Sequence, residues 1–276
     1  MSAVKRFGLV AVLQIAVLTP ALGLPVAPAR GGEIEIRPHR AVYNMELAGS
    51  RSNSTVVQAS GRLEFEWADA CDGWTLTQRA KIEVGHNDGN VYDFGWSYSA
   101  WEAKDEKTYR FFIRRLYGGE AEEEVKGKAT LSPSTGGMAV FEVPEAREVT
   151  LPAGTLFPSH HTIEVLEALQ SGEMPLWREV FDGSGDEGIY GVSAAEVQEL
   201  APGDARGFAS PLLADQTSWF VQLAFFGMDE TQALPEQEQG MRLYANGIAD
   251  QMTFDYGDFS VSARLTELEA LPPSGC

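Results

Sequence analysis

The feature that most constrains the fold of this chain is the alternation of apolar and polar side chains in short segments. The clearest segment is a run of alternate aromatic residues, Tyr92, Phe94, Trp96 and Tyr98. A period of two places these four side chains on one face of a β-strand. The same alternation recurs at residues 62–67, 252–257 and 259–266. The sequence therefore predicts a protein built mainly of β-strands.

Short turn signals rich in glycine and asparagine separate the alternating segments, for example at residues 86–90, 117–119, 135–137 and 245–247. Such short gaps favour antiparallel hairpins. Counting the segments gives about a dozen strands, and a meander of this length is expected to curl because closure protects its edges. We predict an all-β fold, a many-stranded antiparallel β-spiral or open barrel, as a single domain over residues 30–276.

One segment near the middle of the chain has helical periodicity instead. An apolar stripe runs through residues 163–169, and Gly172 ends the segment. Ser159, directly after Pro158, is expected to cap the first turn. The sequence therefore predicts one central helix that crosses between strands.

Residues 1–29 have the pattern of a secretory signal peptide. Lys5 and Arg6 precede an uncharged, mostly apolar stretch at residues 7–24, and small residues follow around positions 21–23 and 27–29. An uncleaved anchor is the alternative, but Gln14, Thr19 and Pro20 interrupt a stretch of only marginal spanning length. We expect cleavage, export, and no transmembrane anchor in the mature protein.

The charge balance excludes some partners. The chain has 40 acidic and 21 basic residues, a formal net charge of −19. A nucleic-acid binder needs clustered lysine and arginine, and adsorption to anionic lipids needs positive charge, so neither is expected. An acidic run at residues 120–124 indicates a solvated face, with docking of a basic partner as the alternative.

The chain contains only two cysteines, Cys71 and the last residue, Cys276. An oxidising compartment favours one disulfide between them, although two unpaired thiols are the alternative. Closing so long a loop would contribute at most about 5 kcal/mol.

Residues that could carry chemistry are few. Ser159 with His160 or His161 would suit a hydrolase, but this needs an orienting group and an oxyanion site. Adjacent histidines on a helix point about 100° apart, which suits joint metal binding poorly. Residues 181–188 resemble a calcium loop, yet the sixth and twelfth positions hold Glu187 and Ser193, so a hairpin turn is favoured. We expect no catalytic residues, no metal site and no cofactor.

The aromatic strand faces allow two interpretations. Tyr92, Phe94, Trp96 and Tyr98 either belong to an ordinary core or line a cavity for an apolar ligand, as in calyx-like carriers. The pattern alone does not distinguish a filled interior from a hollow one. We treat these four residues as candidate ligand-facing aromatics.

Several stretches together resemble the alphaproteobacterial cell-envelope-integrity (EipB-type) family of exported periplasmic proteins. They are residues 38–43, 61–66, 69–74, 151–161 and 181–184, with the closing Cys276 after residues 271–273. The resemblance covers essentially the whole mature chain. It implies a many-stranded β-spiral, similar in outline to periplasmic lipoprotein carriers, and a disulfide between Cys71 and Cys276. It also implies a role in envelope homeostasis without an established enzymatic activity.

We therefore expect a non-enzymatic periplasmic factor for cell-envelope integrity that binds a hydrophobic ligand or an envelope protein. The possible partners are a lipid, a lipoprotein or a periplasmic protein. The alternatives are a structural adaptor without a ligand cavity, and a periplasmic hydrolase that uses Ser159 with His160 or His161.

Overall fold

One continuous antiparallel sheet dominates the computed structural model, which describes residues 34–276 except 133, 229–232 and 273. The predicted signal peptide at 1–29 lies outside the described residues. The strands are β1 (His39–Ser50), β2 (Val56–Asp69), β3 (Gly73–His86), β4 (Val91–Ala103), β5 (Thr108–Tyr117), β6 (Glu120–Ser132), β7 (Gly136–Val143), β8 (Arg147–Leu151), β9 (Leu176–Phe181), β10 (Ile189–Leu200), β11 (Ser218–Phe226), β12 (Gln237–Tyr244), β13 (Ala249–Asp255) and β14 (Phe259–Ala270). The helix α1 (Pro158–Ser171) lies between β8 and β9 in the chain.

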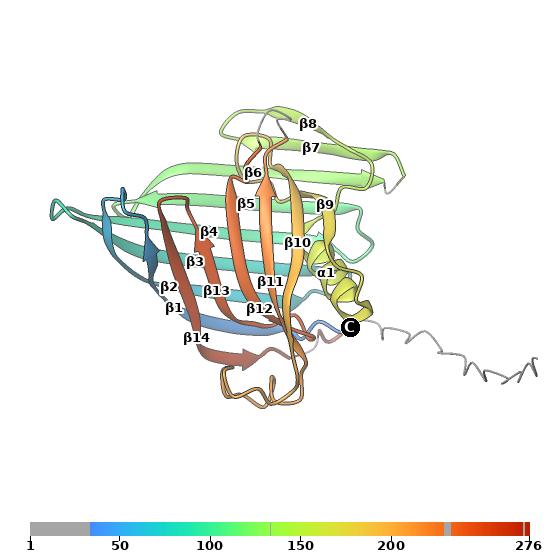
Figure 1. Cartoon of the computed structure of the whole chain (residues 1–276). Helices are drawn as coiled ribbons and strands as arrows, with labels where there is room; N and C mark the ends of the chain where they lie inside the picture. Colours follow the sequence, from blue (N-terminus) through green and yellow to red (C-terminus); the bar gives the residue numbers. More distant parts are fainter. Residues whose placement is uncertain (1–33, 133, 229–232, 273) are drawn as a thin grey trace, which may run out of the picture. The chain divides into compact units, whose positions relative to one another are not determined.

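The strand order explains why the sheet curls. It runs β8-β7-β6-β5-β4-β3-β2-β1-β14-β13-β12-β11-β10-β9, so the first and last strands of the chain pair in the middle. The two sheet edges, β8 and β9, are consecutive in the chain and are joined through α1. Figure 1 shows β9–β13 folded across the face of β2–β6 at a steep angle. The predicted fold class, an open antiparallel barrel with one central helix, is confirmed, and the described residues form 14 strands.

The segment before the helix is attached to one of these edges. The backbone N–H of Leu156 donates to the carbonyl of Glu179 at 2.9 Å, and the carbonyl of Leu156 accepts from the N–H of Phe181 at 2.9 Å. These bonds form a parallel bridge to the edge strand β9. They satisfy backbone groups that an open edge would expose, and they hold the start of α1 beside the sheet.

The inner face of the curled sheet is filled by side chains from both of its halves. Trp67 of β2 packs in one cluster with Leu166 of the helix and Trp219 of β11. A second cluster joins β4–β8 to β9 and β10 through Phe111, Phe141 and similar residues. A third joins β1–β3 to β13 and β14. Within the described ranges, no helix is both long enough and apolar enough to cross a bilayer.

Candidate binding surfaces

A disulfide joins Cys71 to Cys276, as predicted, with 5.9 Å between the two Cα atoms. Cys71 lies in the turn between β2 and β3 with a left-handed φ of 65°. Asp69 stabilises this turn, because its Oδ1 accepts from the Cys71 N–H at 3.0 Å and from the Lys104 ammonium at 2.6 Å. The bond therefore fixes the last residue of the chain beside a turn that is 205 positions away.

The Ser-His-His segment begins α1, and a carboxylate from the sheet satisfies its polar groups. Glu102 of β4 is fully buried. Its two oxygens accept from the backbone N–H groups of Ser159 at 2.7 Å and His160 at 2.9 Å, and one of them also contacts His160 Nδ1 at 2.5 Å. The prediction that Ser159 caps the helix is wrong. The cap position is Phe157, without a side-chain hydrogen bond, and the charge of Glu102 complements the helix dipole instead.

The hydrolase alternative required a hydrogen bond between Ser159 and a histidine. Ser159 is fully buried, and its Oγ has no hydrogen-bond partner among the described residues. Burial lowers the pKa of His160, but the hydrogen bond and charge of Glu102 outweigh this effect and leave that pKa raised. Burial lowers the pKa of His161 to about 4. The two histidines therefore have separate surroundings, and neither is paired with Ser159.

The calcium-like sequence at 181–188 forms the turn between β9 and β10, as expected. Asp182 Oδ1 accepts from the backbone N–H and the hydroxyl of Ser184, both at 2.8 Å. Burial raises the pKa of the Asp182 carboxyl. In the part of the chain that the structure describes, no group of three or more acidic, histidine or cysteine side chains is placed to hold a metal.

The four candidate aromatics share one face of β4, but their surroundings differ along the strand. The Tyr98 hydroxyl is hydrogen-bonded to that of Tyr109, which is fully buried. Trp96 is partly buried against the core. Tyr92 and Phe94 are 36% and 38% exposed. The alternation placed all four residues on one face correctly. Whether they contact a ligand stays a prediction.

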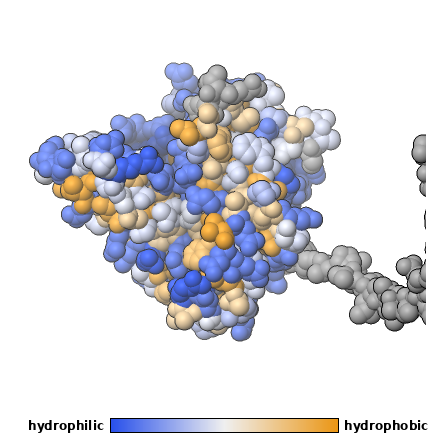
Figure 2. Space-filling model, in the orientation of Figure 1, coloured by the Kyte–Doolittle hydropathy of each residue, from blue (hydrophilic) through white to orange (hydrophobic). Residues whose placement is uncertain are grey.

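An exposed aromatic cluster lies where β4 begins and β5 ends. Phe94 is the cross-strand partner of Tyr117, and the rings of Tyr92 and Phe94 lie 6.1 and 5.4 Å from that of Tyr117. Tyr117 is 43% exposed and Val91 is 64% exposed. We call Tyr92, Phe94 and Tyr117 the aromatic tip; Val91 directly precedes Tyr92 and lies on the opposite face of the strand. In Figure 2 an apolar patch among hydrophilic residues is visible at the projecting end of the molecule. Tyr117 was missed because its strand does not alternate strictly.

Acidic residues adjoin the aromatic tip. They belong to the β3–β4 turn, to β4 and to the start of β6, and they are Asp88, Asp93, Glu120, Glu122 and Glu123. Glu123 forms an ion pair with Arg115 at 2.6 Å. Glu120 and Glu122 are exposed, as expected for the acidic run. The tip therefore combines apolar contact area with negative charge.

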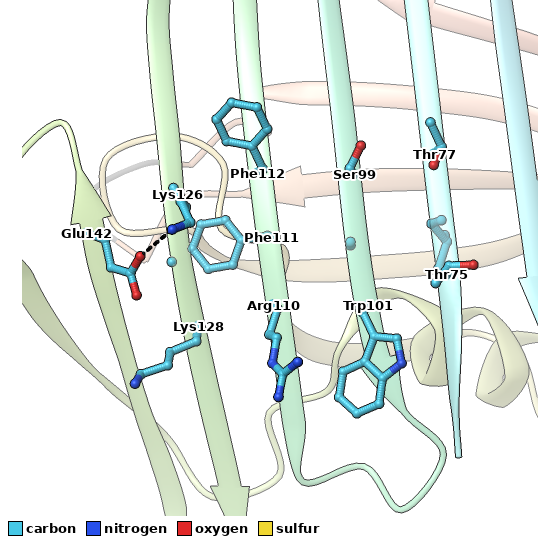
Figure 3. Close-up of a pocket in the computed structure, with 13 residues that line it drawn as sticks. Thr75, Thr77, Ser99, Trp101, Arg110, Phe111, Phe112, Lys126, Lys128 and Glu142 are labelled. Carbon is cyan, nitrogen blue, oxygen red and sulfur yellow. Dashed lines mark ion pairs between the residues drawn. The ribbon is translucent and has the colours of Figure 1, made fainter. Parts of the chain in front are cut away.

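A second surface lies on the outer face of β3–β7, where an open groove encloses about 510 Å³. Its outward side chains come from alternate positions of these strands, and they are Thr75, Thr77, Ser99, Trp101, Arg110, Phe112, Lys126, Lys128 and Glu142 (Figure 3). The sequence interpretation missed this groove, because it depends on cross-strand register. The only sequence signal is the alternation of basic and other residues at 126–128.

Comparison with known proteins decides the family. The model of the EipB-like family matches residues 31–272. The chain belongs to the EipB-like family. A similar protein is the "Cell envelope integrity protein EipB" of Brucella abortus (strain 2308). It is 29% identical over 254 residues, which cover 90% of this chain and 89% of the relative.

The EipB-like fold is also present in a solved structure. The crystal structure of a β-barrel-like protein of unknown function from Brucella abortus matches with a TM-score of 0.80 and 26% identity. The match covers 87% of this chain and all of that one, 100%. The resemblance stated from the sequence is therefore confirmed for family and for fold.

Proposed function

We propose that this EipB-like protein is a non-enzymatic factor of the periplasm that supports cell-envelope integrity by binding a protein partner at the aromatic tip. The family membership and the name of the Brucella relative support the envelope role. The predicted signal peptide and the Cys71–Cys276 disulfide support the periplasm, because structural disulfides persist in oxidising compartments. The exposed Tyr92, Phe94 and Tyr117 carry the binding proposal.

Aromatic side chains contribute much of the energy of protein interfaces because they bury a large area at a small entropic cost. Three aromatic rings in mutual contact and partly exposed to solvent form such an anchor. Their mutual contacts already restrict the side chains, so binding would immobilise few further rotamers. The partner is expected to bring an apolar pocket or ridge to this end of the sheet.

The charge around the tip defines the partner further. Glu120 is the cross-strand partner of Tyr117, and Asp88 and Asp93 lie close in sequence to Tyr92 and Phe94, in a protein with a formal net charge of −19. Anionic lipid headgroups would be repelled by this charge. A partner with basic residues beside its apolar contact would be attracted and oriented.

A hydrophobic-ligand carrier is the second candidate. It is supported by the partly exposed Tyr92 and Phe94, which face the interior side of the sheet, and by the partly buried Trp96. The three packed clusters fill much of that side, whereas Tyr92 and Phe94 remain partly exposed. Native mass spectrometry of protein purified from the periplasm separates the candidates, because a carrier retains a lipid-sized mass and the proposed factor does not.

Photocrosslinking in cells tests the partner. A benzoylphenylalanine at Val91, the residue directly before Tyr92, flanks the aromatic tip without removing any of its rings. It replaces a side chain that is 64% exposed, and the control position Val197 on β10 is 68% exposed. We expect a recurrent protein adduct at position 91 only, lost when Phe94 and Tyr117 are also replaced by serine. No adduct, the same adduct at position 197, or a lipid adduct alone would contradict the proposal.

A further inference from the structure

Two basic side chains face each other across neighbouring strands without an ion-pair partner. Arg110 of β5 and Lys128 of β6 are direct register partners, and both are exposed. Among the described residues, neither has a carboxylate oxygen within 4.0 Å, whereas the adjacent Lys126 contacts Glu142 at 2.8 Å. Like charges directly opposite each other destabilise a sheet. A bound anion would remove this repulsion.

Aromatic rings lie beside these charges. They belong to two rows of side chains that run across the strands through register partners. Trp101 is the register partner of Arg110, and the Arg110 guanidinium lies 5.1 Å from the Trp101 ring centre. Phe112 is the partner of Lys126 in the second row. Figure 3 shows both rings on the groove side with the basic side chains. The groove therefore combines flat apolar faces with positive charge.

The absence of a side chain at Gly73 leaves room for the Trp101 ring. A Cβ at Gly73 would lie 2.5 Å from two atoms of the indole, so any larger residue would displace the ring. The rows continue on the other side into hydroxyl groups, because Thr75 pairs with Trp101 and Ser99 pairs with Phe112. From β3 to β6, one row is therefore Thr75, Trp101, Arg110 and Lys128, and the other is Thr77, Ser99, Phe112 and Lys126. In both rows the hydroxyl and aromatic groups come before the cations.

We propose that this groove binds an acidic oligosaccharide. Carboxylates of the sugar would neutralise Arg110 and Lys128, the apolar faces of its rings would stack on Trp101 and Phe112, and its hydroxyls would exchange hydrogen bonds with Thr75 and Ser99. The site is separate from the aromatic tip. The choice of an acidic glycan of the envelope as the natural ligand rests on the proposed periplasmic location.

The dimensions favour this class over other anions. Four strands spaced about 4.8 Å apart span about 14 Å, which exceeds the reach of a single phosphate and suits a short oligomer. Nucleic acids need many phosphate contacts, and the groove offers three cations, of which Lys126 is already paired. An anionic bilayer is flat and would be repelled by a formal charge of −19. A small ligand avoids that long-range repulsion by making local contacts.

Isothermal titration of the mature protein with trigalacturonate tests the proposal, with neutral tri-N-acetylchitotriose (called chitotriose below) and inorganic phosphate as comparisons. We expect trigalacturonate to bind at least tenfold more tightly than either. The double variant Arg110→Ala with Lys128→Ala should weaken binding at least tenfold. Phe112→Leu, which keeps an apolar side chain, should weaken it at least threefold.

A matched control keeps the charge change equal. Arg79 and Lys81 are exposed basic residues outside the groove, and replacing both by alanine should change the affinity less than twofold. Removing the opposed charges of Arg110 and Lys128 should leave the melting temperature equal or higher, which separates lost binding from lost folding. Groove variants should also keep the adduct at position 91.

Several results would overturn the proposal. They are no binding of trigalacturonate, equal binding of chitotriose or phosphate, an equal loss in the Arg79 and Lys81 control, and binding to vesicles of anionic phosphatidylglycerol that competes fully with the sugar. The failure of sugar binding would leave the proposed partner site at the tip untouched, because the two experiments use different residues and readouts.

Discussion

The two ends of strand β4 differ although their side chains follow the same alternation. At one end, which we call the covered end, Tyr98 and Glu102 lie beneath the start of α1, and Glu102 is fully buried. At the other end, Tyr92 and Phe94 have the same orientation on the sheet but remain 36% and 38% exposed. Periodicity determines which face a side chain occupies. What covers that face depends on segments that are distant in sequence.

The difference between the two ends of β4 also predicts which substitutions affect stability and which affect binding. The covered end carries the disulfide, the helix start and the buried histidines, so substitutions there are expected to act on folding. The aromatic tip makes fewer internal contacts, so substitutions there are expected to act on binding. The predictions below test this division.

The largest effect is expected from the disulfide at the covered end. Cys71→Ser should lower the free energy of unfolding by up to about 5 kcal/mol, because the bond closes a loop of 205 residues and thereby restricts the unfolded chain. Urea unfolding in oxidising buffer measures the loss. Reducing agent should bring the wild type to the level of the variant, and coincident curves for oxidised wild type and Cys71→Ser would contradict the claim.

The second effect concerns acid. Burial lowers the pKa of His39 and of His161 from 6.5 to about 4, so the folded protein binds fewer protons than the unfolded chain between these values. Their contribution to stability is complete above pH 6.5 and is lost as the pH falls towards 4, by about 3 kcal/mol for each histidine.

The matched variants are His39→Gln and His161→Gln, which remove the titrating group and keep a polar side chain. Each should reduce the difference in unfolding free energy between pH 7 and pH 4 by about 3 kcal/mol. An unchanged difference in both variants would show that these histidines are not buried in the neutral form.

How far the sequence predicts this molecule depends on the range of the interactions involved. The strand pattern, the helix at 158–171 and the family were predictable because they follow from local periodicity and from contiguous motifs such as residues 69–74. The capping of α1 by Glu102 was not predictable, because 57 positions separate Glu102 from Ser159. The groove was missed for a similar reason, since Arg110 and Lys128 meet only through the register of β5 and β6.

The third effect tests the polar contact at the covered end. Glu102→Gln should lower the free energy of unfolding by about 2 kcal/mol, because it removes the charge from three hydrogen bonds at the helix start. The control is Glu106→Gln, whose carboxylate is 51% exposed and lies 3.5 Å from His160. It should change stability by less than about 0.5 kcal/mol.

The pH dependence of Glu102→Gln gives an independent readout. The raised pKa of His160 means that its ion pair with Glu102 stabilises the fold fully below pH 6.5 and less as the pH rises through the raised value. The variant should therefore be more destabilising at pH 6 than at pH 8. A loss that is equal at both pH values would indicate that packing, and not charge, explains the role of Glu102.

The smallest effect on stability is expected at the aromatic tip. Phe94→Ser removes a ring that is 38% exposed and contacts two other aromatic rings, so the loss should stay near 1 kcal/mol. Phe157→Ala, at the covered end, removes a ring that is only 1% exposed and should lose about 4 kcal/mol. If Phe94→Ser destabilised the protein as strongly as Phe157→Ala, the tip would be part of the core. If instead Phe94→Ser kept the melting temperature and lost the adduct at position 91, the exposed end of β4 would act in binding, because its rings would then be needed for the partner and contribute little to the stability of the fold.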